Sequence, residues 1–392
     1  MGHVCTDINQ GALPAMLPFL ILAYDLSLAV AATVMLANSV VSAIIQPLFG
    51  YLGDKVDRPW FMSLGILLAA CGIAAMGFFD SFAAILACAL LTGVGVAIFH
   101  PEGAKLANVV AGENKGAGIS NFSVGGNIGF ATGPIIATFA LVNWGMHGTV
   151  IFLIPAVIAA VILLTQTKAY HRLTDVEHKR ISSKGEVTRK DDWVGFSKVT
   201  CVNICRSIVG NAILTFIPLY WIVVLGQTQE FGVLILTVYS IGSAVATLIG
   251  GRIADRIGFK RMILLSAGTL APFMLIFLFT FNVVVATALI LLCGIAQSLA
   301  YSSMIALGQA YLPSRIGMAS GISLGVVVSV GGMVSPGIGA IGDTWGLSAS
   351  MGVACALAFV AVGIALTLFI GRNAQDGIGD MKKKATPKET PN

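Results

Sequence analysis

Charged residues are scarce in this chain. Asp, Glu, Lys and Arg make up 10% of its 392 residues, whereas 57% are hydrophobic. Soluble proteins carry about 25% charged residues, because a surface in contact with water needs them. An ordinary soluble domain is therefore excluded, and most of the surface must face lipid. The basic excess is small, a formal net charge of +5, so it does not predict nucleic-acid binding.

Cysteine motifs and phosphate-binding motifs are also missing. The seven cysteines lie in apolar runs and include no CxxC pair, so neither a disulfide framework nor a zinc site is predicted. A phosphate cradle of the form GxxxxGK[ST] is absent, and every polar segment is too short for a nucleotide-binding domain. These absences argue against an ATP-driven pump, and we expect no metal and no cofactor.

Long apolar runs dominate the chain instead. A helix of about 20 apolar residues spans a bilayer core about 30 Å thick, and twelve runs of that kind occur. We therefore expect an all-α membrane protein with 12 transmembrane helices in two pseudo-symmetric six-helix bundles. The expected helices are residues 2–24, 28–52, 60–79, 82–108, 115–143, 146–167, 194–225, 229–252, 259–281, 283–312, 314–342 and 346–371.

The same runs divide the chain into four parts. Residues 1–167 are expected to form an N-terminal bundle and residues 194–371 a C-terminal bundle. The charged stretch 168–193 is expected to be a cytoplasmic linker, and the Lys-rich residues 372–392 a cytoplasmic tail. The first apolar run lacks a basic flank and a small-residue cleavage site, so we expect no cleavable signal peptide.

The positions of the basic residues predict the orientation. All 23 Lys and Arg residues except Arg206 lie on the side of the membrane that carries both termini. Because Lys and Arg accumulate in cytoplasmic loops, we expect both termini in the cytoplasm. Arg206 lies inside the seventh expected helix.

Three sequence blocks recur at an offset of about 200 residues. GYLGDKVDRP, from Gly50 to Pro59, recurs as GRIADRIGFKR, from Gly251 to Arg261. LPAMLP is echoed by LTFIPLY, and SVGGNIGFATGP by SVGGMVSPGIG. Transporters are often built from two related bundles with the substrate site between them. The repeat therefore predicts a transporter rather than a channel or a receptor.

The first of these blocks resembles the cytoplasmic signature of the major facilitator superfamily, GxxxD[RK]xGx[RK][RK]. The second copy fits it almost completely, whereas the first has Asp57 in place of glycine and Pro59 and Trp60 in place of the basic pair. Glycine permits close backbone approach, and an aspartate can accept from a helix N-terminus. We expect these loops to hold a cytoplasmic gate shut; alternatively, they only fix topology. The gating candidates here are Gly50, Asp54, Lys55, Arg58, Gly251, Asp255, Arg256, Lys260 and Arg261.

The fifth expected helix contains GxxxGP, formed by Gly129, Gly133 and Pro134. It resembles the motif associated with antiporters of the superfamily, so we add these residues to the gating candidates. Small residues four apart also allow tight helix contact, and proline bends a helix. Packing alone is therefore the alternative interpretation.

Within the superfamily, the chain resembles the fosmidomycin resistance protein family of efflux transporters. The resemblance lies in GHVCTDINQGALPAMLPFL, FHPEGAKLAN, RSIVGNAILTFIPLYW and MASGISLG. It implies a secondary active transporter of the bacterial inner membrane that works by alternating access. The transporter would export a small, anionic or polar drug-like molecule, such as fosmidomycin, in exchange for protons. The alternative is a proton-coupled importer of a small metabolite such as a sugar or an organic acid.

Few ionisable residues lie inside the expected helices. A charge at membrane depth is costly, and it persists where it pairs or serves transport. Asp7, His100 and Arg206 are each expected roughly 15 Å from the cytoplasmic end, at about 1.5 Å per residue. His3 shares a helix face with Asp7, whereas Glu102 is expected to point away from His100.

These residues suggest an exchange mechanism. We interpret Asp7 and Glu102 as proton carriers. Arg206 either neutralises Asp7 or binds an anionic group of the substrate in a fork geometry. In a purely structural interpretation, Asp7 and Arg206 form a static pair and Glu102 pairs with Lys105. The proton-coupling candidates are Asp7, Glu102, His100 and His3.

Polar side chains at the same depth could line a substrate cavity or bond neighbouring helices. The substrate-binding candidates are Arg206, Asn9, Gln10, Asn38, Gln46, Asn121, Asn127, Asn203, Asn211, Gln297 and Tyr301.

An integral membrane enzyme is a remote alternative, with a reactive cluster drawn from His3, Asp7, His100 and Glu102. A channel or a receptor could also have twelve helices, but the paired gate loops argue against both, because alternating access predicts paired gates and a channel does not. The expected partners are a small-molecule substrate, protons and the lipid bilayer. One chain contains both halves, so we expect a monomer.

Overall fold

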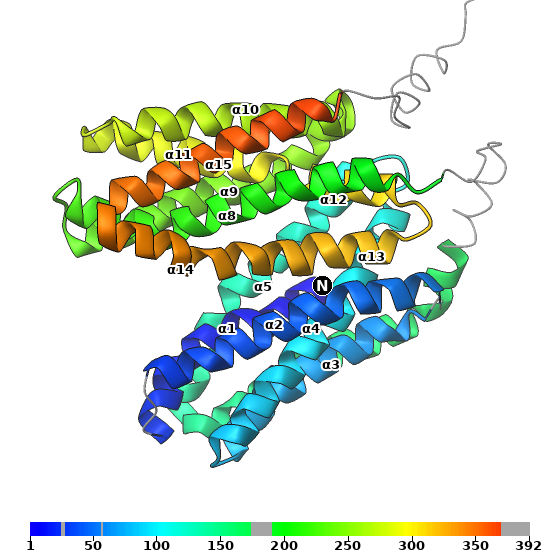
Figure 1. The fold of residues 1–392 in the computed structure, drawn as a ribbon. Helices are drawn as coiled ribbons and strands as arrows, with labels where there is room; N and C mark the ends of the chain where they lie inside the picture. Colours follow the sequence, from blue (N-terminus) through cyan, green and yellow to red (C-terminus); the bar gives the residue numbers. More distant parts are fainter. Residues whose placement is uncertain (25–27, 56–57, 174–189, 370–392) are drawn as a thin grey trace, which may run out of the picture.

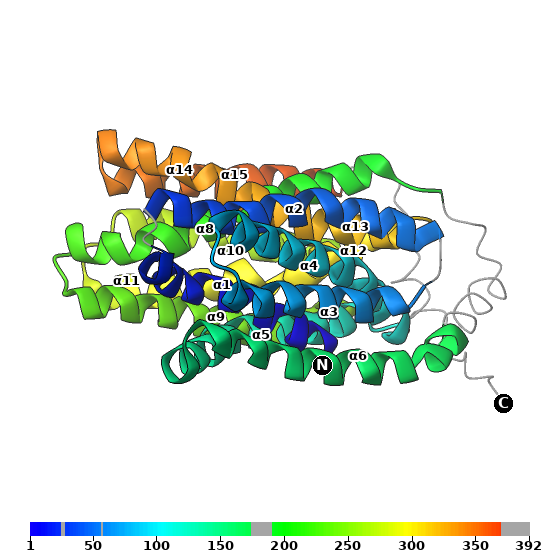
Figure 2. The same cartoon turned by 90° about the horizontal axis from the view of Figure 1, so that it is seen from below.

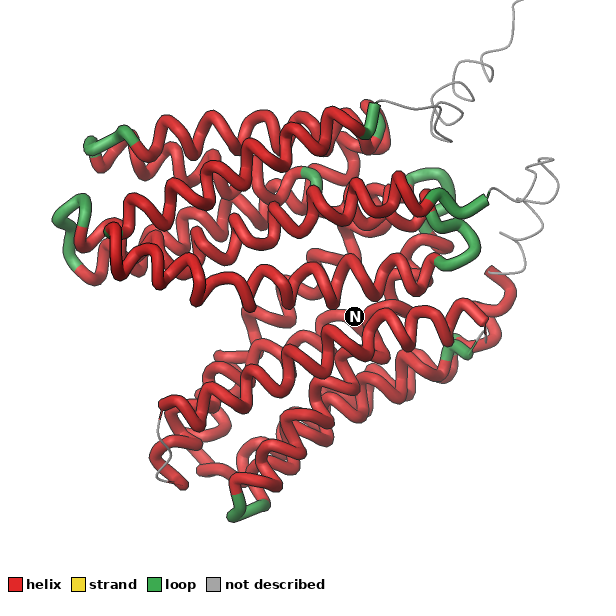
Figure 3. The backbone as a smooth tube through the Cα atoms, viewed as in Figure 1, coloured by secondary structure: helices red, strands yellow, loops and turns green. Residues whose placement is uncertain are grey.

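The computed structural model describes residues 1–24, 28–55, 58–173 and 190–369. Within those ranges the chain forms helices and short connections, without a strand (Figure 3). Ten helical stretches are long and apolar enough to cross a membrane. One of them, Lys115–Thr165, has 51 residues and contains two passes, and the polar first helix is the twelfth. The prediction of an all-α membrane protein with twelve passes is confirmed.

The N-terminal bundle holds the first six passes. Its elements are α1 (Gly2–Tyr24), α2 (Leu28–Lys55), α3 (Trp60–Ala75) with the 3₁₀ turn η1 (Met76–Phe78), α4 (Phe82–Val110), α5 (Lys115–Trp144), and the 3₁₀ segment η2 (Gly145–Phe152) with α6 (Leu153–Thr165).

The C-terminal bundle holds the other six. Its elements are α8 (Trp193–Val223), α9 (Gln229–Ile257), α10 (Phe259–Leu278), α11 (Val283–Leu299), α12 (Tyr301–Tyr311), α13 (Ile316–Gly321), the π segment η3 (Ile322–Val326), α14 (Val327–Trp345) and α15 (Leu347–Thr367). In the view of Figure 2, the long helices of both bundles run roughly along one direction.

Short polar residues fix several helix starts. The side chains of Ser81, Thr228 and Asn282 accept hydrogen bonds from backbone N–H groups in the first turns of α4, α9 and α11. This satisfies donors that the helix cannot pair itself. Between α9 and α10 the chain turns at Gly258, whose φ of 94° is the left-handed conformation that glycine adopts readily. Local sequence thus sets the lengths of the passes.

The tenth pass differs from the prediction of one helix over 283–312. It is broken at Ala300, so that α11 ends and α12 begins there. Two carbonyl groups of the last turn of α11 are bonded from other helices: Ser266 Oγ donates to Ala296 O at 2.6 Å, and Arg206 Nη1 donates to Gln297 O at 3.1 Å. Side chains from α10 and α8 therefore replace bonds that a continuous helix would make itself.

The repeat predicted from the sequence is also present in the structure, at an offset of 201 residues. Helices α2, α4 and α5 begin at residues 28, 82 and 115, and their counterparts α9, α11 and α13 begin at residues 229, 283 and 316. The two bundles meet at the end where α2 and α9 finish and diverge towards the opposite end (Figure 1). The bundles are therefore in contact at one end, the closed end, and lie apart at the other, the open end.

Some predicted features lie wholly or partly outside the described residues. Residues 174–189 of the expected linker and the expected tail 372–392 are among them, as is Asp57 of the first signature copy. The linker, the tail and the four-part division of the chain stay predictions.

Candidate functional site

Three ionisable side chains meet in the N-terminal bundle. His3 Nε2 and His100 Nε2 each lie 3.2 Å from an oxygen of Asp7, on Oδ2 and Oδ1 respectively. All three residues are buried, with exposed fractions of 8%, 6% and 8% for His3, His100 and Asp7. His3 and Asp7 are one turn apart on α1, and His100 comes from α4. We call His3, Asp7 and His100 the triad.

Backbone carbonyls orient both imidazole rings. His3 Nδ1 lies 2.6 Å from Phe122 O on α5, and His100 Nδ1 lies 2.9 Å from Val96 O one turn earlier on α4. The His3 ring also stacks on the Phe122 ring, with centroids 3.8 Å apart, and contacts the edge of His100. Each ring is therefore held from both sides, which fixes where its second nitrogen points.

Glycines of α5 make room for the triad. A Cβ atom at Gly126 would lie 2.7 Å from Asp7 Oδ2, and one at Gly129 or Gly133 would meet carbonyl oxygens of α1. The GxxxGP motif thus packs α5 directly on α1 within one bundle, as its packing interpretation predicts. A gating role for Gly129, Gly133 and Pro134 stays a prediction.

Arg206 lies on α8 of the other bundle. Its Nε donates to Asn203 Oδ1 at 3.2 Å, its Nη1 donates to the carbonyl that the broken tenth pass leaves open, and its guanidinium lies 4.9 Å from the centre of the Tyr301 ring. Gln297 Nε2 returns a bond to Arg206 O at 2.7 Å. Among the described residues, no carboxylate lies within ion-pair distance of this arginine.

Tyr301 lies near both the triad and Arg206. The Arg206 guanidinium is 4.9 Å from the centre of its ring, and Tyr301 is close enough to Asp7 for an electrostatic interaction. With the offset of 201, Tyr301 occupies in the C-terminal bundle the position that His100 occupies in the N-terminal bundle. Asp7 and Arg206 do not form an ion pair, because the two histidines occupy the Asp7 carboxylate. Of the two options considered for Arg206, direct neutralisation of Asp7 is not realised in this conformation.

Glu102 points away from the triad, as the sequence predicted. It is buried, and its Oε1 lies where a Cβ atom at Gly53 would be. Lys105, one turn later, donates to Gly53 O at 2.8 Å. Glu102 therefore lies against the first signature loop, between the triad and the closed end.

The signature aspartates lie at helix N-termini of the opposite bundle. Asp54 accepts from Gly317 N at 2.7 Å and from Met318 N at 3.0 Å, in the first turn of α13. Asp255 accepts from Gly116 N and Ala117 N, both at 2.8 Å, in the first turn of α5. Donors and acceptors are all related by the offset of 201. The predicted contact between each aspartate and a helix N-terminus is confirmed.

The signature glycines bring the backbones of the two bundles together. A Cβ atom at Gly317 would lie 2.5 Å from Gly50 O, and one at Gly116 would lie 2.5 Å from Gly251 O. The reciprocal positions, Gly50 and Gly251, are equally tight. No side chain fits at any of these four positions without separating the bundles.

The basic residues of the two signature copies lie nearer the surface than the signature glycines. Lys55 lies 4.5 Å from the centre of the Tyr51 ring. The side chains of Arg58, Arg256 and Arg261 are exposed, and Lys260 is partly buried. Gating roles for these five basic residues stay predictions.

The remaining polar candidates fall into two groups. Asn38 donates to Ala89 O inside the N-terminal bundle, Gln46 packs against residues 321–325 of the other bundle, and Asn121 accepts from Arg252 Nη2. These contacts favour packing over substrate binding for those three. For the other four candidates, substrate binding stays a prediction. Asn9 donates to Cys5 O and Asn211 donates to Ser207 O, whereas Gln10 is partly buried and Asn127 is exposed.

A buried polar contact that sequence reasoning did not assign joins the two bundles. Asn108 Nδ2 donates to Gln309 Oε1 at 2.6 Å, and Gln309 Nε2 donates to Ser320 Oγ at 2.9 Å and Ala104 O at 3.3 Å. Residues 108 and 309 are themselves 201 apart, so they meet on the pseudo-two-fold axis. The repeat offset, applied to the last residue of FHPEGAKLAN, could have found this pair.

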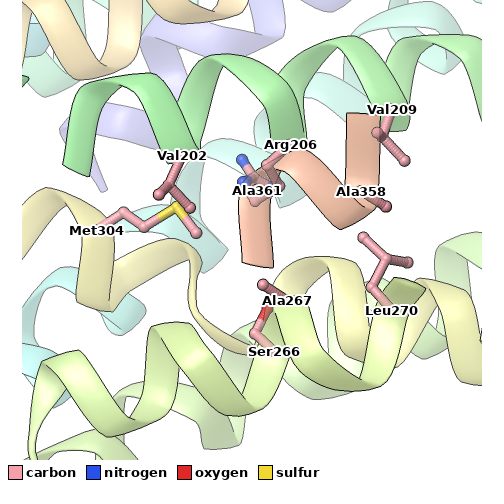
Figure 4. Close-up of a pocket in the computed structure, with 9 residues that line it drawn as sticks. All are labelled: Val202, Arg206, Val209, Ser266, Ala267, Leu270, Met304, Ala358 and Ala361. Carbon is pink, nitrogen blue, oxygen red and sulfur yellow. The ribbon is translucent and has the colours of Figure 1, made fainter. Parts of the chain in front are cut away.

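A small pocket lies beside Arg206 (Figure 4). Its walls all belong to the C-terminal bundle, and apart from Arg206 and Ser266 they are apolar. The lining residues are Val202, Arg206, Val209, Ser266, Ala267, Leu270, Met304, Ala358 and Ala361. Because only one bundle lines this pocket, we do not assign it to the substrate.

The triad also has the composition of a cation site. One potential ligand atom from each of the three residues lies within 4.8 Å of the others. Both Nε2–oxygen distances nevertheless fall at the upper end of the range of N–H···O hydrogen bonds. Protons therefore account for the arrangement without a metal.

Comparison with known sequences identifies the family. The model of the Major Facilitator Superfamily matches residues 1–336 and 199–390. YfnC of Bacillus subtilis (strain 168), described as an uncharacterized MFS-type transporter, is 31% identical over 92% of this chain and 88% of its own length. The fosmidomycin resistance protein of Escherichia coli (strain K12) is 28% identical over 88% of this chain and 85% of its own length.

Solved structures show the same fold. FucP, a Major Facilitator Superfamily transporter in the outward conformation, matches with a TM-score of 0.70 at 17% identity, covering 95% of this chain and 98% of FucP. A bacterial homologue of the iron transporter ferroportin, in an outward-facing state, matches with a TM-score of 0.70 at 16% identity, covering 94% and 98%. The chain therefore belongs to the Major Facilitator Superfamily, as a multi-pass secondary transporter.

Proposed function

We propose that this transporter exports a small anionic or polar molecule in exchange for protons. One observation carries the proposal: a partly buried arginine in the C-terminal bundle has no carboxylate partner among the described residues. An unneutralised cation at membrane depth is costly and marks a functional site. Of the five N–H donors of Arg206, two are bonded to Asn203 Oδ1 and Gln297 O. The remaining fork suits a carboxylate, phosphonate or phosphate group.

Proton coupling is assigned to the opposite bundle. Asp7, with His3 and His100, is a buried titratable cluster facing Tyr301, and Glu102 is a second buried acid nearer the gate. When the bundles come together at the open end, an ionised Asp7 competes with the substrate anion for Arg206. Protonation of the cluster removes that competition. Release of protons from the cluster thus promotes release of the substrate anion from Arg206, which links the two movements.

Alternating access is supported by the paired contacts at the closed end. Breaking the two aspartate caps and the Asn108–Gln309 bond would let the bundles rock apart there and close at the other end. With the signature loops in the cytoplasm, as the basic residues predict, the structure is the outward-open state. We assign the protein to the bacterial inner membrane with both termini cytoplasmic, and to a monomer, because one chain carries both bundles.

Transport in proteoliposomes tests the proposal. The purified chain would be reconstituted with fosmidomycin as the first probe, because that drug is named in a relative at 28% identity, followed by other phosphonates and organic acids. A proton gradient should drive saturable movement of one of these against the direction of proton flow. Arg206→Gln should abolish it, and Asp7→Asn should uncouple it from the gradient.

Some results of the same transport assay would contradict the proposal. Movement of substrate in the same direction as protons would show the importer that the sequence left as the alternative. Anion transport that survives Arg206→Gln, or gradient-driven transport that survives both Asp7→Asn and Glu102→Gln, would overturn the assignment of these residues.

A further inference from the structure

The two histidines of the triad have their tautomers set by the backbone. Nδ1 of His3 faces Phe122 O, and Nδ1 of His100 faces Val96 O. A carbonyl oxygen only accepts hydrogen bonds, so each Nδ1 must carry the hydrogen. In a neutral imidazole the other nitrogen is then a bare acceptor. Both rings therefore turn a proton-accepting Nε2 towards Asp7 whenever they are uncharged.

The contacts with Asp7 then require protons. His3 Nε2 lies 3.2 Å from Asp7 Oδ2, and His100 Nε2 lies 3.2 Å from Asp7 Oδ1. An ionised carboxylate is also acceptor-only. Two neutral rings against this carboxylate would make two acceptor–acceptor contacts in a buried place, which are repulsive. One proton satisfies only one of these contacts, whereas two protons satisfy both.

We propose that the triad is a two-proton site, in which Nε2 of His3 and Nε2 of His100 carry one transported proton each and Asp7 is the fixed anion between them. The inference rests on the proposed proton coupling and deepens it, because it makes the two histidines, rather than Asp7, the proton carriers. Loaded with two protons, the site has a formal charge of +1; emptied of both, it has a charge of −1.

The surroundings contain few groups that could take over this role. On α1 itself, Cys5 and the amino terminus are nearby. Helix α4 contributes His100, with Glu102 turned towards Gly53. From α5 the cluster meets Phe122 and glycines, which do not titrate. From the other bundle, Tyr301 is close enough to Asp7 for an electrostatic interaction, and Arg206 lies over the Tyr301 ring. Within the described residues, Asp7 is therefore the anion shared by both rings.

Nitrogen NMR of the full chain in lipid bilayers tests the inference without a substrate. The protein would carry ¹⁵N-labelled histidine rings, with His147, His171 and His178 replaced by Gln so that only His3 and His100 report. The sample would be treated with a chelator to exclude metal ions. On raising the pH, both rings should lose the hydrogen from Nε2 and keep it on Nδ1, with two protons released per chain.

Variants separate the site from its surroundings. In Asp7→Asn, the two rings should no longer both carry a hydrogen on Nε2 at the pH at which the parent chain holds two protons, because the single amide oxygen can accept from only one of them. Asp343→Asn, which changes an exposed carboxylate at the open end, should titrate like the parent. Single His3→Gln or His100→Gln variants should release one proton each.

Two results would overturn the two-proton site. They are release of a single proton by the parent chain, or a neutral ring that carries its hydrogen on Nε2. Either result leaves gradient-driven transport in proteoliposomes possible through one carrier. Conversely, absence of any pH-gradient dependence in that transport assay would defeat the proposed function while the titration stood. The two failures are therefore distinguishable.

Discussion

Asp54→Asn is expected to shift the transporter towards the state that opens at the signature loops. In the present conformation, Asp54 accepts two backbone N–H bonds at the N-terminus of α13. A hydrogen bond to a charged group contributes about 1.5–3 kcal/mol, and a carboxylate at a helix N-terminus adds about 0.3–1 kcal/mol. Asparagine keeps one accepted bond and turns its NH₂ group towards the second donor.

The closed state should therefore lose about 2–3 kcal/mol, which changes the ratio of closed to open molecules by roughly 30- to 150-fold. Asp255→Asn should produce a shift of the same size, because its two bonds to Gly116 and Ala117 are the equivalents of those of Asp54. The two substitutions share no partner, so their effects should add in the double variant.

Spin-label distance measurements in lipid would record the populations. Labels at positions 79 and 281 suit this purpose, because Phe79 and Phe281 are exposed at the open ends of the two bundles. Serine would replace the exposed Cys71 and Cys201. The inter-label distance should shorten in Asp54→Asn and Asp255→Asn, and it should stay unchanged in Asp343→Asn. Unchanged populations in both signature variants would refute a latch made by these bonds.

Three further predictions concern the same machinery. Gly50→Ala should shift the spin-label distances as Asp54→Asn does, because a Cβ atom there meets a carbonyl of the other bundle, whereas Gly332→Ala, with open space around it, should not. Arg206→Lys keeps the charge but loses the fork, so the KM for an anionic substrate in proteoliposomes should rise roughly 10- to 150-fold, for a loss of about 1.5–3 kcal/mol; an unchanged KM would exclude fork recognition. Asn108→Ala leaves Gln309 Oε1 buried without its donor, which should cost the closed state about 1–3 kcal/mol; an unaltered distance distribution would mean that this bond does not hold the gate.

Much of the architecture could be predicted because lipid imposes simple rules on a sequence. Every pass must be long, apolar and helical, since backbone groups cannot remain unpaired in a bilayer. The position of Asp54 four residues after Gly50, repeated at Asp255 and Gly251, was sufficient to predict a latch at a helix N-terminus. That motif is local, and its partner is a generic feature of any helix.

The break in the tenth pass shows where such rules end. Residues 283–312 are continuously apolar enough to span a membrane, and the chain contains no proline between 283 and 311. The break at Ala300 depends on Ser266 and Arg206 from two other helices, which bond the carbonyls that it leaves open. A change in backbone bonding stabilised from other segments has no signature within its own segment.

The hydrogen-bond partners of the charged residues could likewise not be predicted from the sequence. Depth alone placed Asp7, His100 and Arg206 at one level and left open a direct pair between Asp7 and Arg206. Which side chain reaches which depends on helix rotation and on the small residues between helices. Gly126 clears the space beside Asp7 and Phe122 O holds His3, so the carboxylate meets two histidines instead.

By itself, the sequence determined through its apolar runs and its repeated blocks that this protein is a twelve-pass transporter of two related halves. The placement of its few charges predicted which side is cytoplasmic and which ionisable residues lie at depth. Tertiary structure decided how those residues are paired: His3 and His100 on Asp7, Arg206 on a broken helix, and Asn108 on Gln309 at the pseudo-two-fold axis. The physical reason is that burial in lipid acts on each segment separately, whereas a hydrogen bond between helices depends on the relative position of two segments distant in the chain.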